Sequence, residues 1–182
     1  MSKTISFSRT FPAGHPKAGE PTHFVEKIWK SLLDSNIEIE DYIYEVGKVL
    51  PGYQYADDVL FAVDNETPKT HKIVPGKKWK AGDVFSPRVW ASPGGRFTKG
   101  NSQIIIAPDI KLVRVADFEI TIDGFIYIDG KYMFSTWFRS NIEFIELSKN
   151  DGLSVCDFDS WFEKIIPFSG QILIWSDKEL PY

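Results

Sequence analysis

Cysteine is nearly absent from this sequence. The chain of 182 residues holds a single cysteine, Cys156, so it cannot form a disulfide bond within itself. The sequence also contains no cluster of cysteine and histidine at the spacing of a zinc site. We therefore expect a protein of a reducing compartment, with no structural metal and no other cofactor.

Long apolar runs are missing as well. No stretch approaches the roughly 18 apolar residues of a membrane-spanning helix, and the first residues lack the apolar core of a signal peptide. The Gly-rich phosphate loops of dinucleotide and nucleoside-triphosphate sites are absent, as is the Gly-x-Ser-x-Gly turn of many hydrolases. These absences predict a cytoplasmic protein with no membrane partner, and they leave those three chemistries without support.

The composition is that of one globular domain. With 43% hydrophobic and 25% charged residues, the chain is large enough to enclose a continuous core. No internal repeat, low-complexity tract or long linker divides it. We therefore expect a single domain spanning residues 1–182, and the sequence implies no obligate protein partner.

The first third of the chain predicts helices. Residues 24–33 carry apolar side chains at helical spacing after Thr22, a favoured N-cap residue, and Trp29 lies on the apolar face, where we expect it to be buried. A weaker helix is predicted over residues 37–46. Residues 53–63 follow no single period, so a loop, a short strand or both fit them equally.

From residue 70 onward the sequence predicts short strands separated by tight turns. Asp123-Gly124 and Asp129-Gly130 are hairpin signals, because glycine accepts the positive φ that such turns require. Together with an opening strand, the expected strands cover residues 4–9, 70–74, 84–90, 103–106, 110–118, 120–122, 125–128 and 132–134. This pattern is typical of a meander or a small β-barrel, mixed but mostly antiparallel.

The last part of the chain returns to helices and closes with a strand. Asn141 is expected to cap a helix that ends at Gly152, and Ser154 to cap a second helix, in which Cys156 would be a buried or half-buried thiol. Residues 171–175 have the composition of a closing strand. Elements in this order predict an α+β fold, a small β-barrel with flanking helices.

Positive charge is concentrated in one segment. Residues 69–99 carry eight basic side chains against Asp83 alone, a net charge of +7. Because the whole chain has a net charge of -4, the remaining residues sum to -11. This separation predicts a positive face that attracts an anionic ligand on an otherwise acidic body. A lysine-rich, solvated hairpin with no ligand is the alternative.

Aromatic side chains alternate with the cations of this segment. Trp79, Trp90 and Phe97 offer flat faces on which a base can stack, each worth roughly 1–3 kcal/mol. Lysine and arginine supply charge for phosphate oxygens. The segment therefore favours a nucleotide or single-stranded RNA as partner, and its expected ligand-binding residues are Lys69, His71, Lys72, Trp79, Arg88, Trp90, Arg96 and Lys99.

A series of motifs stands in a set order along most of the chain. The motifs are Lys69-Thr-His-Lys-Ile73, Gly76-Lys-Lys-Trp-Lys-Ala-Gly-Asp83, Arg88-Val-Trp90, Leu147-Ser-Lys-Asn-Asp-Gly-Leu-Ser154 with Phe158-Asp-Ser-Trp-Phe162, and Gly170-Gln-Ile-Leu-Ile-Trp175. In this order and at these distances they resemble the ASCH domains of the PUA-like superfamily. The resemblance implies a small PUA-like β-barrel with a cleft beside the lysine-bearing segment, where such domains are generally proposed to bind RNA or nucleotides.

The resemblance extends in part to those ASCH proteins that are amidohydrolases acting on acylated nucleosides. Their motif looks like a lysine, a threonine three positions later and a carboxylate from the C-terminal helical region. Lys69 matches the lysine and Asp151 falls where the carboxylate is expected, so the resemblance makes these two the catalytic residues of an enzyme. The threonine position holds Lys72, whose ammonium cannot act as the hydroxyl nucleophile.

Three functions follow as hypotheses. The first is binding of a nucleotide or single-stranded RNA by a basic, Trp-lined cleft, and the second is an amidohydrolase that uses Lys69 and Asp151 on acylated nucleosides. The third is a module that docks another protein through an aromatic-rich surface. For the enzyme, His71 is a candidate proton shuttle, because the ordinary pKa of histidine lies near neutrality. Asp151 has a plainer reading, as a turn former before Gly152.

Overall fold

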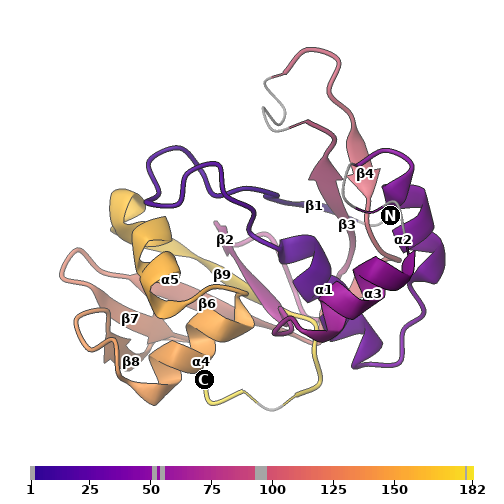
Figure 1. Ribbon diagram of the computed structural model, residues 1–182. Helices are drawn as coiled ribbons and strands as arrows, with labels where there is room; N and C mark the ends of the chain where they lie inside the picture. The colour runs from indigo at the N-terminus through magenta and orange to yellow at the C-terminus, as the bar shows by residue number, and fades with distance from the viewer. Residues whose placement is uncertain (1–2, 51–52, 54–55, 93–97, 179) are drawn as a thin grey trace. The chain divides into compact units, whose positions relative to one another are not determined.

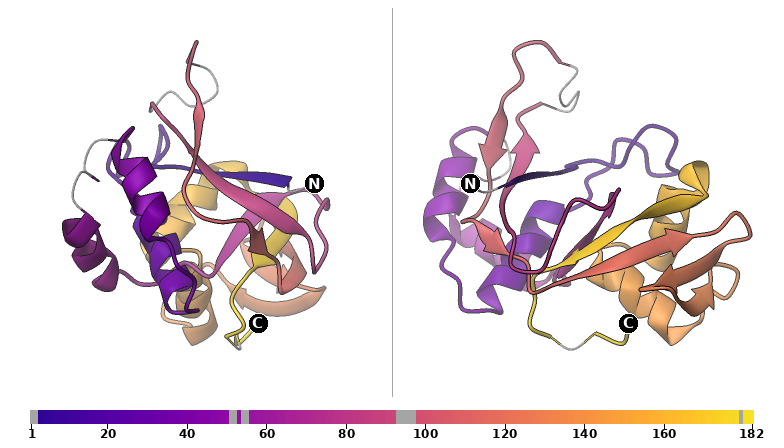
Figure 2. Two further views of the ribbon diagram at one scale, coloured as in Figure 1. Left: turned by 90° about the vertical axis from the view of Figure 1, so that its right-hand side faces the viewer. Right: turned by 180° about the vertical axis from the view of Figure 1, so that it is seen from behind.

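A computed structural model gives the structure of residues 3–50, 53, 56–92, 98–178 and 180–182. Figure 1 and Figure 2 show it from several sides. The helices are α1 (Phe24–Leu33), α2 (Glu40–Gly47), α3 (Ala56–Asp64), α4 (Ile142–Asn150), α5 (Val155–Phe162) and the 3-10 turn η2 (Glu163–Ile165). The strands are β1 (Lys3–Phe7), β2 (His71–Pro75), β3 (Val84–Trp90), β4 (Gln103–Ile105), β5 (Ile110–Lys111), β6 (Arg114–Ile120), β7 (Phe125–Ile128), β8 (Lys131–Ser135) and β9 (Phe168–Ile174). This content confirms the predicted α+β class.

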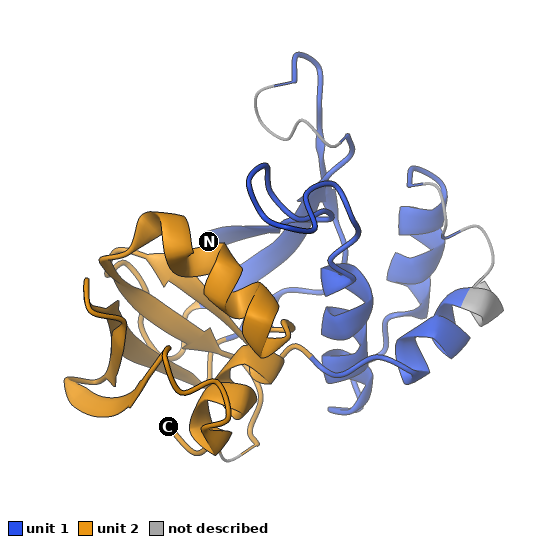
Figure 3. Cartoon of the chain, turned by 60° about the vertical axis from the view of Figure 1, so that its left-hand side comes forward, with its two compact units in different colours: residues 1–68, 84–111 blue, residues 69–83, 112–182 orange. Residues whose placement is uncertain are grey.

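The chain divides into two compact units, and each is described by itself (Figure 3). Unit 1 contains residues 1–68 and 84–111, and unit 2 contains residues 69–83 and 112–182. The basic segment 69–99 therefore contributes residues to both units. The single domain over residues 1–182 stays a prediction.

Unit 1 joins a small mixed sheet to helices α1, α2 and α3. Strand β1 runs parallel to β3, while β4 and β5 pair with β3 in the antiparallel sense. Trp29 of α1 is fully buried, and its indole N–H donates to the carbonyl of Ile106 at 2.6 Å. The predicted core position of Trp29 is thus confirmed, and the hydrogen bond satisfies its one polar atom.

Unit 2 is a five-stranded antiparallel sheet in the order β2-β9-β6-β7-β8, with α4 and α5 covering one face (Figure 1). The right-hand view of Figure 2 shows the opposite face of this sheet. The hairpin between β7 and β8 turns at Asp129 and Gly130, which both have positive φ (51° and 77°), as a two-residue turn requires. No closed barrel is formed by the paired strands of the described residues.

Phenylalanine side chains fasten α4 and α5 to the sheet of unit 2. The rings of Phe134 in β8 and Phe144 in α4 stack at 5.2 Å, and Phe144 meets Phe158 of α5 at 5.6 Å. Both predicted caps are formed: Asn141 accepts the N–H of Phe144, and Ser154 accepts the N–H of Asp157. The first turns of both helices are therefore capped, and α4 packs against both β8 and α5.

Several elements differ from the sequence-based expectation. Helix α2 begins at Glu40, three residues later than predicted, and α3 forms where no period is visible. Strand β9 begins at Phe168 instead of residue 171, and Cys156, expected to be buried or half-buried, is exposed on α5. Among the helices of the described ranges, none is long and apolar enough to cross a membrane.

Candidate functional site

Helix α4 ends in a turn that fixes Asp151. Gly152, with φ of 77°, donates its N–H to the carbonyl of Lys149 at 2.8 Å, and Leu153 donates to the carbonyl of Ser148 at 2.9 Å. These two bonds form a Schellman cap, so the predicted role of Gly152 as the C-terminal glycine is confirmed. Asp151 stands directly at the helix end and is only 7% exposed.

Backbone hydrogen bonds place Lys69 against this helix end. The N–H of Thr70 donates to the carbonyl of Asn150 at 2.9 Å, and the N–H of Trp175 donates to the carbonyl of Thr70 at 3.2 Å. The chain entering β2 is therefore held between the last residue of α4 and the end of β9. The Lys69 side chain points inward from this position and is 1% exposed.

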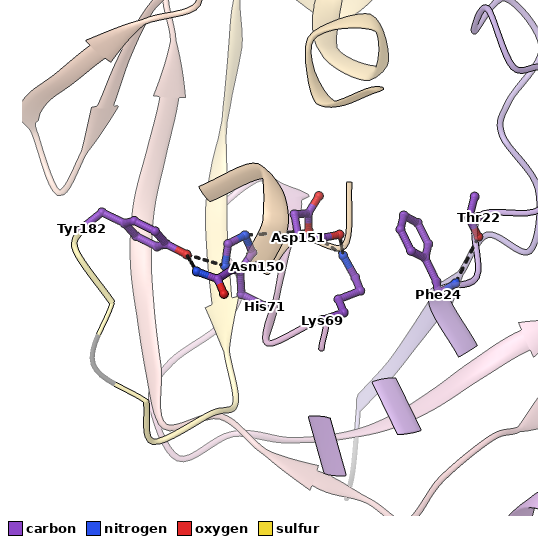
Figure 4. Close-up of polar contacts among 7 residues, drawn as sticks. All are labelled: Thr22, Phe24, Lys69, His71, Asn150, Asp151 and Tyr182. Carbon is purple, nitrogen blue, oxygen red and sulfur yellow. Dashed lines mark hydrogen bonds and ion pairs between the residues drawn. The ribbon is translucent and has the colours of Figure 1, made fainter. Parts of the chain in front are cut away.

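Lys69 and Asp151 form a buried ion pair (Figure 4). The distance from Lys69 Nζ to Asp151 Oδ1 is 2.7 Å, and the same ammonium donates to the backbone carbonyl of Asp151. A cation at the C-terminus of a helix is also favoured by the helix dipole. The carboxylate, the carbonyl and the dipole all favour the charged form of Lys69.

The carboxyl group of Asp151 experiences opposing influences. Burial raises the pKa of Asp151 above its usual value, while the charge of Lys69 and a hydrogen bond from the backbone N–H of Ile73 act in the opposite direction. If Lys69 were removed, its lowering effect on the pKa of Asp151 would be lost. The protonation of this carboxyl group therefore depends on Lys69.

His71, the first residue of β2, lies in the same cluster (Figure 4). It is fully buried, with Nδ1 at 2.9 Å from the hydroxyl of Tyr182, and this hydroxyl accepts a hydrogen bond from the amide of Asn150 at 3.0 Å. Burial and, secondly, the nearby charge of Lys69 lower the pKa of His71 well below its ordinary value. The imidazole is therefore neutral at pH 7.

The two ring nitrogens of His71 have different surroundings. The Tyr182 hydroxyl accepts from Asn150 and can also donate its own proton to Nδ1, and in that tautomer the imidazole proton lies on Nε2. Among the described residues, Nε2 has no hydrogen-bond partner, and it lies 3.9 Å from Asp151 Oδ1. A buried donor without a partner costs roughly 1–3 kcal/mol, so an atom of a bound molecule that accepted from Nε2 would recover that energy.

Lys72 carries a second amine, and the charges of Lys69 and Asp151 act on it. It follows His71 in β2, so its side chain leaves the opposite face of the strand, and the residue as a whole is half-buried. Burial around its ammonium and the positive charge of Lys69 lower the pKa of Lys72 to about 7, against a smaller opposing effect of Asp151. At neutral pH this lysine is present in both its charged and its neutral form.

Trp79 is held in place within unit 2. Its backbone N–H donates to the side-chain oxygen of Gln171 at 3.0 Å, and the amide of Gln171 donates back to the carbonyl of Trp79 at 3.3 Å. The indole is half-buried, between the exposed Lys78 and Lys80. The neighbouring Lys77 pairs with Asp117 at 2.5 Å on the surface.

The remaining predicted binding residues belong to unit 1. Arg88 and Trp90 are half-buried on β3, where the guanidinium of Arg88 donates to the hydroxyl of Ser86 at 3.4 Å. Lys99 is exposed, and Arg96 lies outside the described residues. Of the predicted site, the structure brings Lys69, His71 and Asp151 into one buried cluster, and the side chain of Lys72 leaves β2 on the face opposite His71. A single working face over the whole segment 69–99 stays a prediction.

Sequence reasoning missed Asn150 and Tyr182. Asn150 had one signal, its place beside Asp151 in the last turn of a predicted helix, whereas Tyr182 is distant in sequence from every other member of the cluster. In the part of the chain that the structure describes, no group of three or more His, Cys, Asp or Glu side chains is arranged to hold a metal ion.

The chain was compared with protein-family models, with curated proteins and with solved structures, and it matches none of them. The resemblance to ASCH domains therefore stays a prediction from the sequence motifs. The chemistry of the Lys69–Asp151 cluster is interpreted from its own geometry.

Proposed function

We propose that this chain is a small hydrolase that cleaves a carboxylic amide or ester at the Lys69–Asp151 pair. The observation that carries the proposal is the buried contact of 2.7 Å between Lys69 Nζ and Asp151 Oδ1. Apolar residues often fill such a position with equal or greater stability, so an ion pair kept in the interior favours a chemical role. The shifted pKa values of His71 and Lys72 beside it are of the kind that gather at active sites.

We assign the role of general base to Lys72. Lys69 already donates to two oxygens of Asp151, which favours its protonated form, whereas the pKa of Lys72 is lowered to about 7. A base acts most effectively when its pKa lies near the working pH. Lys72 occupies the position of the threonine in the catalytic ASCH motif, so in this proposal an activated water replaces the hydroxyl nucleophile.

In the proposed reaction Lys72 first accepts a proton from water and later donates it to the leaving group. The neutral amine of Lys72 takes a proton from water while the water oxygen bonds to the carbonyl carbon, and the carbonyl electron pair moves onto its oxygen. The charge of Lys69 offsets the negative charge that develops there. Lys72 then returns the proton to the leaving nitrogen or oxygen as its bond to carbon breaks.

An acylated nucleoside is the substrate class that this proposal takes from the ASCH resemblance. The half-buried indole of Trp79 supports it, since a nucleobase can stack on an indole face. A PUA-like barrel is the corresponding fold proposal, supported by the short antiparallel strands β6, β7 and β8 and their tight turns.

Release of the acyl group from an acylated cytidine tests the proposal. The protein is expected to release the free acid, and Asp151→Asn, which keeps the shape but removes the charge, is expected to lower the rate by about 100-fold or more. Asp117→Asn is the matched control, because its carboxylate pairs with Lys77 on the surface, and its rate should not change. No release from acylated nucleosides, or equal rates for both variants, would contradict the proposal.

A second candidate function is binding of a nucleotide or single-stranded RNA without hydrolysis. The two hydrogen bonds between the Gln171 side chain and the backbone of Trp79 favour RNA binding, because they fix the part of the chain that exposes Lys78 and Lys80. Affinity for a short single-stranded RNA is then expected to fall with salt, and the slope of log affinity against log salt should be about -0.7 per phosphate contact.

The matched variants for RNA binding are Lys78→Ala, Lys80→Ala and, as control, Lys131→Ala, an exposed lysine of β8. Each of the first two should reduce the magnitude of the salt slope by about 0.7, and the control should leave it unchanged. An affinity that stays constant as salt rises, or three variants with the same effect, would rule out phosphate contacts by this segment.

A further inference from the structure

Unit 2 contains a cavity that shares no residue with the Lys69–Asp151 cluster. Its volume is about 450 Å³, which lies within the range of small-molecule sites. The lining residues used below are Ile122, Trp137, Arg139, Asp159, Glu163 and Ile166. They come from the turn before β7, the loop after β8, helix α5 and the turn that follows it.

Trp137 presents a rigid aromatic face to solvent at this cavity. Its side chain is 79% exposed, yet its indole N–H donates to the carbonyl of Asp123 at 2.9 Å, and its backbone N–H donates to the hydroxyl of Ser135 at 3.3 Å. Gly124 allows this close approach, because a Cβ atom there would lie 2.5 Å from Thr136 Oγ1 and 3.4 Å from Trp137 Nε1. The ring is thus fixed in orientation although little covers it.

The charges around the cavity are unequal. Arg139 and Asp159 form an ion pair, so their charges offset each other. Glu163 is exposed on η2, and among the described residues no cation pairs with its carboxylate. The lining therefore carries one net negative charge, close to an indole whose face is itself electron-rich. An anionic ligand would be repelled by both.

We propose that this cavity binds a small organic cation, of the quaternary ammonium or guanidinium class, on the face of Trp137. The cation would lie against the indole, the aromatic ring best suited to this interaction, with Glu163 supplying the opposite charge. Ile122, which is 75% exposed, and Ile166 offer apolar contacts to the methyl or methylene groups of such a ligand. This inference does not depend on the proposed hydrolase.

Calorimetric titration of the full chain with choline tests the inference. Choline is expected to bind, and its uncharged isostere, with carbon in place of the quaternary nitrogen, is expected to bind more weakly. Trp137→Ala should weaken choline binding by about 2- to 30-fold, the range of a cation–π contact, and Trp137→Phe by less because the ring is retained. Glu163→Gln should weaken choline binding and leave the isostere unaffected.

Two variants serve as controls. Phe138→Ala removes the exposed aromatic side chain next to Trp137, and Glu38→Gln removes an exposed carboxylate of unit 1, and neither should change choline binding. Equal affinity for choline and the isostere overturns the inference, as does a choline affinity that Trp137→Ala leaves unchanged. Should Trp137→Ala fail to fold, Trp137→Phe and Glu163→Gln are milder changes that still decide the outcome.

Discussion

Replacing Lys69 by methionine is expected to lower the free energy of unfolding by about 3–5 kcal/mol at neutral pH. Methionine keeps most of the length of the side chain but leaves the Asp151 carboxylate buried without its cation. Burial raises the pKa of Asp151, so the folded variant takes up a proton at a higher pH than the unfolded chain does. Stability of the variant should therefore rise relative to the wild type as pH falls from about 7 to about 4.

Denaturant unfolding at several pH values measures this effect, with two comparison variants. Lys77→Met removes the cation of an exposed pair with Asp117 and should cost about 0–1 kcal/mol. The double variant Lys69→Met with Asp151→Leu removes both buried charges and should recover most or all of the lost stability. If Lys69→Met costs no more than Lys77→Met, the pair is not buried as the structure has it.

Replacing Lys72 by arginine is expected to abolish most of the hydrolysis, by about 100- to 10,000-fold. Arginine keeps the positive charge but cannot lose its proton near neutral pH, so it cannot act as a base. In the wild type the rate should rise with pH and level off above about 7, because the lowered pKa of Lys72 makes the neutral amine available there. Initial rates on an acylated nucleoside between about pH 5 and 9 give this profile.

Lys78→Arg is the control for this experiment, since Lys78 is an exposed lysine of the same segment and should tolerate the change. The assignment to Lys72 is wrong if Lys72→Arg keeps its rate, or if the wild-type profile has no midpoint near neutrality. A profile that falls with rising pH would instead indicate that a protonated group is needed.

Much of the fold could be predicted from patterns of neighbouring residues in the sequence. Strands β3 and β7 have their predicted bounds, because alternation between turn residues limits a strand at both ends. The caps of α4 and α5 at Asn141 and Ser154 followed from the hydrogen bonds that these side chains offer to the first turn. The predicted N-cap of α1, Thr22, is one residue before the observed N-cap, His23. The hydroxyl of Thr22 still accepts the N–H of Phe24 at 3.4 Å.

Other parts depend on contacts that the sequence does not display. Helix α3 has a weak apolar pattern, and it packs against α1 and α2, which stabilise it in unit 1. Strand β9 extends to Phe168 because β6 continues alongside it, so the pairing partner sets its length. Cys156 is exposed because it lies on the outer side of α5, away from Phe158 and Phe162.

The candidate site was predictable only in part. Lys69 and Asp151 are 82 positions apart, and only the family resemblance suggested that they meet. The charge count assigned Lys69 to a positive face that attracts an anionic ligand, whereas the structure buries it against the end of α4. A count of charges cannot distinguish an exposed lysine from a buried one, because burial depends on which helix end packs against β2. Tyr182 and Asn150 contact His71 through the same tertiary arrangement.

The most direct test of the Lys69–Asp151 centre is the hydrolysis rate of the double variant Lys69→Met with Asp151→Leu. The double variant should have a free energy of unfolding at least as large as that of Lys69→Met and should recover most or all of the lost stability. Its activity therefore reports on chemistry and not on loss of the fold. If the pair is a catalytic centre, the variant stays folded and releases no acyl group from a nucleoside that the wild type hydrolyses. A folded double variant with the wild-type rate would show that the ion pair is structural, and it would contradict the proposed function.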